Sequence, residues 1–107
     1  MTPHELEEAL INEFSTYYLV DDLPRVWNDA SIAELARESA ERLAHDLAPR
    51  DREQLLSQLA QVANERQHRV NREISTSSEI DWAGIDSRWE QFSRLLRAVI
   101  QQLRQLG

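Results

Sequence analysis

Glu65-Arg66-Gln67-His68 is the stretch whose residue types and spacing come closest to metal chemistry. A Glu and a His three residues apart share one face of a helix, which is the spacing used by carboxylate di-metal bundles. Those sites need two such motifs and two further inward Glu residues, whereas this chain has one motif. His45 follows Glu41 by four residues, a different spacing, although a dimer would double the count. We therefore expect a surface Glu–His pair and neither a metal nor a cofactor.

Arg66, Arg69 and Arg72 form a basic stretch that has the composition to contact phosphates. Glu65 and Glu73 flank it, the chain is acidic overall, and no helix-turn-helix is recognisable, so nucleic-acid binding is the less favoured reading. On a helical wheel Arg66 falls within the stripe of Leu59, Val62 and Val70, where a guanidinium must reach water or meet an acid. The favoured prediction is that these arginines pair with acids, either those of the first helix or those of a second copy. A third reading is a protein-partner site, since Arg is enriched among interface anchors.

Catalytic constellations are missing from the sequence. The three histidines, His4, His45 and His68, lie on different segments, and spacing alone supports no Ser-His-Asp arrangement. There is no Gly-x-Ser-x-Gly, no phosphate-binding loop and no dinucleotide fingerprint, and two glycines could not build them. The chain has no cysteine, which excludes disulfides, thiolate ligands and thiol nucleophiles. We expect a protein that is not an enzyme and has no catalytic residues.

The elements that would position these residues are helices. Apolar periodicity predicts an all-α antiparallel bundle of about four helices, in a single domain over residues 1–107. The first runs from about Pro3 to Leu19 behind a Thr2–Glu5 capping box, and the second from about Ser31, with Glu34, to Leu47. The third runs from Arg50 or Arg52 to Ile74. The polar stretch 75–78 is expected to be a loop, and the fourth helix starts between Asp81 and Ser87. The last two helices would form a long hairpin.

Two of these helices have unusually wide or long apolar faces. On the first, Ile11 and Tyr18 widen the arc formed by Leu6, Leu10, Phe14 and Tyr17 beyond what one packing face needs. That helix therefore either sits between two neighbours or has a second contact surface. The fourth helix carries an unbroken heptad seam, which predicts bundle core or a helix-exchange interface. Its members are Trp82, Ile85, Trp89, Phe92, Leu96, Val99, Leu103 and Leu106.

Charge is concentrated at the N-terminus. The net charge is -7, and residues 1–24 contain six acids and no Lys or Arg. An acidic helix suits a basic partner surface, because complementary fields speed encounter; alternatively it only keeps the protein soluble. No apolar run is long enough to span a membrane, and the first residues do not resemble a signal peptide, so we expect a cytoplasmic protein with no membrane partner.

Together these features predict a small acidic helical protein that binds another protein, in the manner of an anti-activator, an inhibitor or immunity-type protein, or a chaperone. The partner would carry a basic surface, and the chain itself would be a homodimer. A nucleic-acid regulator using Arg66, Arg69 and Arg72, and a metal-binding bundle, are the alternatives. The residues predicted to contact the partner are Glu7, Ile11, Tyr18, Trp27, Arg66, Arg69 and Trp82.

Overall fold

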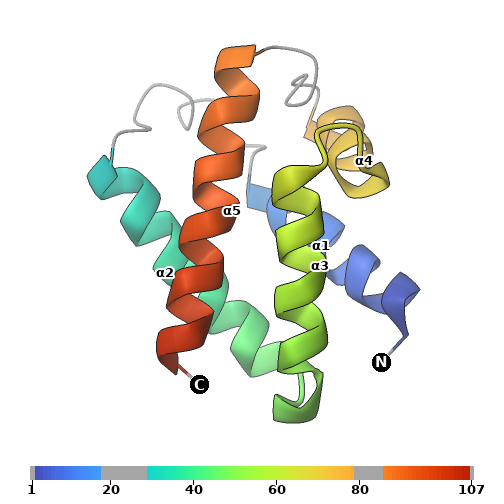
Figure 1. Ribbon diagram of the computed structural model, residues 1–107, viewed down its shortest axis with the longest axis vertical. Helices are drawn as coiled ribbons and strands as arrows, with labels where there is room; N and C mark the ends of the chain where they lie inside the picture. The colour runs from blue at the N-terminus through green and yellow to red at the C-terminus, as the bar shows by residue number, and fades with distance from the viewer. Residues whose placement is uncertain (1, 18–28, 79–85, 107) are drawn as a thin grey trace.

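The computed structural model describes residues 2–17, 29–78 and 86–106, and its regular structure is helical (Figure 1). The elements are α1 (Pro3–Tyr17), α2 (Asp29–Asp46), a 3-10 turn η2 (Pro49–Asp51), α3 (Arg52–Asn64), α4 (Arg69–Ser78) and α5 (Asp86–Leu106). No strand occurs within these ranges, and the predicted all-α helical bundle is confirmed. None of the described helices combines the length and apolar character needed to cross a membrane.

The start of α1 has the predicted capping box. The Thr2 hydroxyl accepts a hydrogen bond from the Glu5 backbone N–H at 3.2 Å, and the Glu5 carboxylate accepts one from the Thr2 N–H at 3.4 Å. Two of the backbone donors that a helix start leaves without partners are thereby satisfied. The predicted start of the second helix was two residues late, because α2 begins at Asp29 and Ser31 already lies inside it.

The predicted third helix, continuous to Ile74, is wrong. Its helical geometry ends at Asn64, Glu65 adopts an extended conformation with φ -105° and ψ 92°, and α4 begins at Arg69. Residues 75–78, predicted to be a loop, form the last turn of α4, where the Thr76 hydroxyl donates to the Arg72 carbonyl at 3.0 Å. The element following α3 is thus a separate short helix that turns away from it (Figure 1).

Packing places α5 between α2 and α3, while α1 lies against α4 and α3 (Figure 1). On α2 the small residues Ala36, Ser39 and Ala40 are buried, and their size allows a neighbouring helix to approach closely. Phe14 of α1 meets Phe92 of α5 edge to face, with ring centroids 5.8 Å apart and planes at 87°. This is the geometry aromatic pairs prefer. This contact packs α1 against α5, the last helix of the chain.

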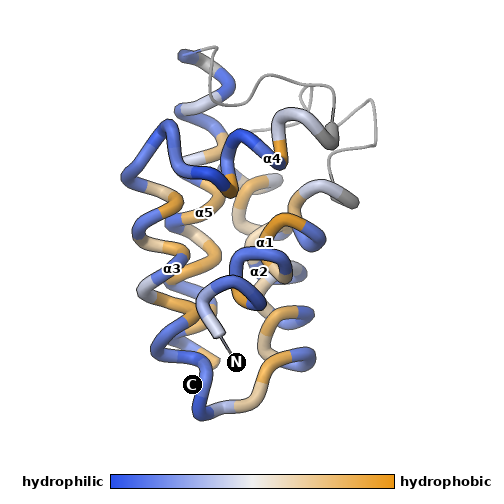
Figure 2. The backbone as a smooth tube through the Cα atoms, turned by 90° about the vertical axis from the view of Figure 1, so that its right-hand side faces the viewer, coloured by the Kyte–Doolittle hydropathy of each residue, from blue (hydrophilic) through white to orange (hydrophobic). Residues whose placement is uncertain are grey.

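The core contains most of the predicted apolar faces. Along the predicted seam of α5, Phe92, Leu96, Val99 and Leu103 are fully buried, Trp89 is partly buried, and Leu106 is 49% exposed. Leu95 and Ile100, which the seam omits, are buried as well, because α5 contacts both α2 and α3. Apolar and polar residues alternate along the helical tubes in Figure 2, as amphipathic helices require. Two predicted seam residues, Trp82 and Ile85, lie outside the described residues.

Candidate functional site

Arg69 lies at the first position of α4 and faces the acidic helix α1. Its guanidinium is 3.0 Å from a carboxylate oxygen of Glu8 and 3.5 Å from one of Glu7. The sequence predicted that the arginines would pair with acids of the first helix, and for Arg69 this pairing occurs within the fold. Glu7 and Arg69, both predicted partner-contact residues, are therefore brought together by the packing of α4 on α1.

Arg66 lies in the turn between α3 and α4. Its guanidinium is 2.7 Å from Asp86 at the start of α5, and the side chain is one-third exposed. The turn removes Arg66 from the apolar stripe on which a continuous helix would have placed it. Arg66 and Arg69 both form ion pairs with carboxylates, so much of the positive charge of the stretch is neutralised. The stretch is therefore less suited to binding phosphates.

The Glu65–His68 pair belongs to the same turn. Because Glu65 is extended, the two side chains do not share a helix face, and the geometry that a di-metal bundle needs is not formed. The His68 Nδ1 accepts a hydrogen bond from the Val70 backbone N–H at 3.1 Å, so His68 caps the N-terminus of α4. Within residues 2–17, 29–78 and 86–106, no group of three His, Asp or Glu side chains is placed to hold a metal ion.

Asn71 and Ser93 hold the end of α3, and the sequence analysis assigned a role to neither. The buried Asn71 amide nitrogen donates to the carbonyls of Val62, at 3.0 Å, and Glu65, at 2.9 Å. The Ser93 hydroxyl, from α5, donates to the Ala63 carbonyl at 3.0 Å. The carbonyls of Val62 and Ala63 are among those that a helix end leaves without intrahelical partners, whereas the Glu65 carbonyl lies in the turn and also accepts the His68 backbone N–H. Asn71 stands among the charged residues Arg69, Arg72 and Glu73, so the sequence carried no signal that set it apart.

Ile11 is buried in the core, with 8% of its surface exposed. At this position the wide apolar arc of α1 therefore packs into the core. The sequence allowed two alternatives for α1, and this is the first of them: a helix between two neighbours. The remaining predicted contact residues, Tyr18, Trp27 and Trp82, lie outside the described residues, as does the side chain of Tyr17.

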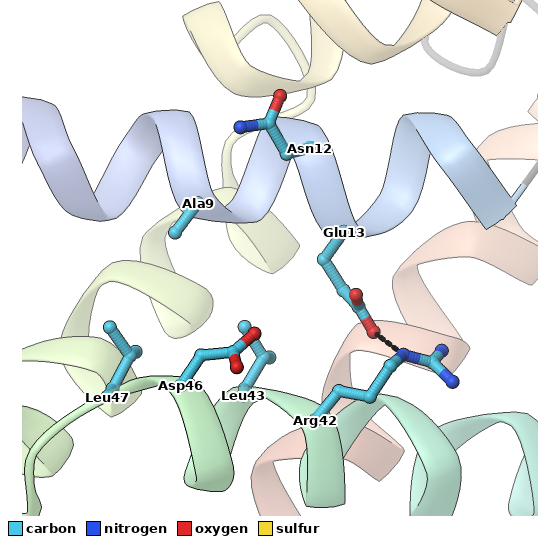
Figure 3. A pocket seen from close by; sticks show the side chains of 7 residues that line it. All are labelled: Ala9, Asn12, Glu13, Arg42, Leu43, Asp46 and Leu47. Carbon is cyan, nitrogen blue, oxygen red and sulfur yellow. Dashed lines mark hydrogen bonds and ion pairs between the residues drawn. The ribbon is translucent and has the colours of Figure 1, made fainter.

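A groove of about 590 Å³ opens between α1 and α2 (Figure 3). Its apolar surface comes from Ala9, Leu43 and Leu47, and its polar rim from Asn12, Glu13, Arg42 and Asp46. Glu13 and Arg42 face each other across the groove at 2.6 Å, and the Glu13 side chain is only 15% exposed. This ion pair bridges the two helices at one end of the groove, and the floor beside it is formed by Leu43 and Leu47, which are largely buried.

The helices that border the groove carry the charge of the protein. Together α1 and α2 contain nine acids and two arginines, a net charge of -7, which equals that of the whole chain. The rest of the chain is therefore electrically balanced. A groove with an apolar surface inside a negative field suits an apolar side chain carried on a basic surface.

Comparison of the chain with protein-family models, curated proteins and solved structures finds no match.

Proposed function

We propose that the chain is a non-catalytic regulator that binds a partner protein in the groove between α1 and α2 and holds it by steric occlusion, as an inhibitor, anti-activator or chaperone does. The groove is the observation that supports the proposal: it is already formed between α1 and α2, the largely buried Leu43 and Leu47 make its floor, and charged groups lie on its rim. Preformed apolar sites with a few polar groups are typical of binding sites.

The proposal includes the chemistry of the partner. Because the net negative charge lies on the two helices that border the groove, the partner carries basic residues around an apolar anchor. Complementary charge raises the association rate and disfavours acidic competitors, and it makes binding weaken as salt is added. We place this interaction in the cytoplasm. The alternative of nucleic-acid binding receives less support, since Arg66 and Arg69 are engaged with carboxylates.

The test compares the substitution of an alanine inside the groove with that of an alanine outside it. Ala9 lines the groove, whereas Ala33 is exposed on α2 away from it. Tagged wild-type chain, Ala9→Trp and Ala33→Trp are used to capture proteins from a lysate of the native cells at low salt, with quantitative mass spectrometry as the readout. Circular dichroism establishes that all three are equally helical.

The proposal predicts one dominant basic protein that is retained by wild type and Ala33→Trp and reduced at least tenfold by Ala9→Trp, because an indole obstructs the groove. Equal capture by both variants would place the partner elsewhere on the surface. Capture of no specific protein by wild type would contradict the proposed function.

A further inference from the structure

No helix-breaking residue accounts for the interruption between α3 and α4. Residues 50–78 contain neither glycine nor proline, and Glu65, Arg66 and Gln67 are good helix formers. The turn is instead held by side chains from further along the chain, namely Asn71 of α4 and Ser93 of α5, which bond the last carbonyls of α3. The same segment therefore has a second structure open to it, a continuous helix.

A continuous helix would satisfy the same carbonyls with its own backbone. In the turn, Asn71 bonds the carbonyls of Val62 and Glu65, and Ser93 bonds that of Ala63. In an uninterrupted helix each of these accepts the N–H four residues ahead. What opposes continuity is Arg66, which would return to the stripe between Val62 and Val70 and lose Asp86.

The interruption also divides the chain into two parts that complete each other. The first part contains α1, α2 and α3, and the second contains α4 and α5. The most extensive described interfaces, α2 with α5, α3 with α5 and α1 with α4, all cross this boundary. Residues 65–68 are the covalent connection between the two parts. Each part thus buries its apolar faces mainly against the other.

We propose that the chain forms a dimer by exchanging these two parts between two copies, with residues 65–68 becoming helical and α3 and α4 merging into one helix over residues 52–78. Every interface across the boundary re-forms with the second copy, so the exchange changes little besides the hinge, the condition under which domain swapping is favourable. The groove between α1 and α2 lies wholly in the first part and is kept in both states. The exchange is therefore independent of the proposed function.

The first experiment compares the hinge variants Arg66→Leu, Gln67→Gly and Gln67→Ala with wild type, after refolding at low and at high protein concentration. Size-exclusion chromatography with light scattering gives the dimer share. We expect a wild-type dimer after concentrated refolding and a larger dimer share for Arg66→Leu. The dimer dissociation constant should be about 20-fold higher for Gln67→Gly than for Gln67→Ala, because Gly destabilises the interior of both merged helices.

The second experiment identifies exchange itself. Asp29 of α2 and Arg94 of α5 form an exposed ion pair across the boundary. The chain has no native cysteine, so Asp29→Cys and Arg94→Cys can be placed on separate chains, refolded together at high concentration and treated with a short bis-maleimide. Exchange predicts a cross-link between the two chains, and little after each is refolded alone when dilute and then mixed.

Circular dichroism checks that each variant is folded. A monomer in wild type and Arg66→Leu at every concentration would overturn the proposal. So would a dimer that gives no cross-link between the two cysteine chains.

Discussion

Asn71 is a fully buried polar residue beside the turn between α3 and α4. Its amide nitrogen donates to the carbonyl of Val62 in α3 and to those of Glu65 and Arg66 in the turn. A buried carbonyl that loses its donor costs about 1–3 kcal/mol of folding free energy, considerably more than an average hydrogen bond contributes. This residue is therefore the side chain on which the turn between α3 and α4 depends most.

Asn71→Leu keeps the branched shape of the side chain but removes its hydrogen bonds, and we expect it to lower the free energy of unfolding by about 1–3 kcal/mol. Asn71→Asp should be worse, because it also places a carboxylate among carbonyl oxygens. Urea unfolding at low protein concentration measures both. Asn12→Leu on the exposed side of α1 is the control and should change stability by less than about 0.5 kcal/mol. Equal stability of Asn71→Leu and the control would show that Asn71 is not needed.

At the scale of the elements, α4 is held on α1 by charge as well as by apolar packing. Arg69 contacts Glu7 and Glu8, and its side chain is 37% exposed. Exposed or half-exposed pairs contribute about 0.2–1 kcal/mol each and are screened by salt. The contacts therefore orient α4 more than they stabilise the protein as a whole.

Arg69→Gln should lower the free energy of unfolding by about 0.5–1 kcal/mol at low salt, and by less in high salt. Arg72→Gln, an exposed arginine on the same helix, is the matched control and should have little effect. A double-mutant cycle with Glu8→Gln isolates the pair. A zero coupling energy between Arg69 and Glu8 at low salt would mean that their proximity has no energetic consequence.

Helix positions were largely predictable because they follow from local periodicity. The faces of α2 and α3, the capping box at Thr2 and most of the α5 seam were all readable from the sequence. The turn at 65–68 was not, because its cause is distant: Asn71 and Ser93 reach carbonyls that are up to 30 positions away in sequence. The one local indication was Arg66, whose charge fell within an apolar stripe.

The candidate site was predictable only in part. The pairing of Arg69 with acids of α1 could be predicted from the charge distribution, because residues 1–24 contain six acidic residues and no Lys or Arg. The groove did not follow, because it depends on how α1 and α2 are placed around α3 and α5. Ile11, predicted as a contact residue, is buried because α1 packs on both α3 and α4.

At the scale of the whole molecule, the turn at 65–68 determines how α4 and α5 are placed on the first three helices. By separating α4 from α3 it lets α4 cover α1, while α5 covers α2 and α3 (Figure 1). The groove between α1 and α2 then opens between the two helices whose sequences carry the net negative charge. We expect the dilute monomer to keep this turn even though Glu65, Arg66 and Gln67 favour a helix.

The most direct test is NMR of the dilute monomer, since backbone carbon shifts report helical geometry residue by residue. The account predicts helical 13Cα shifts over residues 52–64 and 69–78, with an interruption at 65–68. It also predicts nuclear Overhauser contacts from the Asn71 side-chain amide to protons of Val62 and Glu65. Uninterrupted helical shifts from 52 to 78 in a monomer, without those contacts, would contradict it.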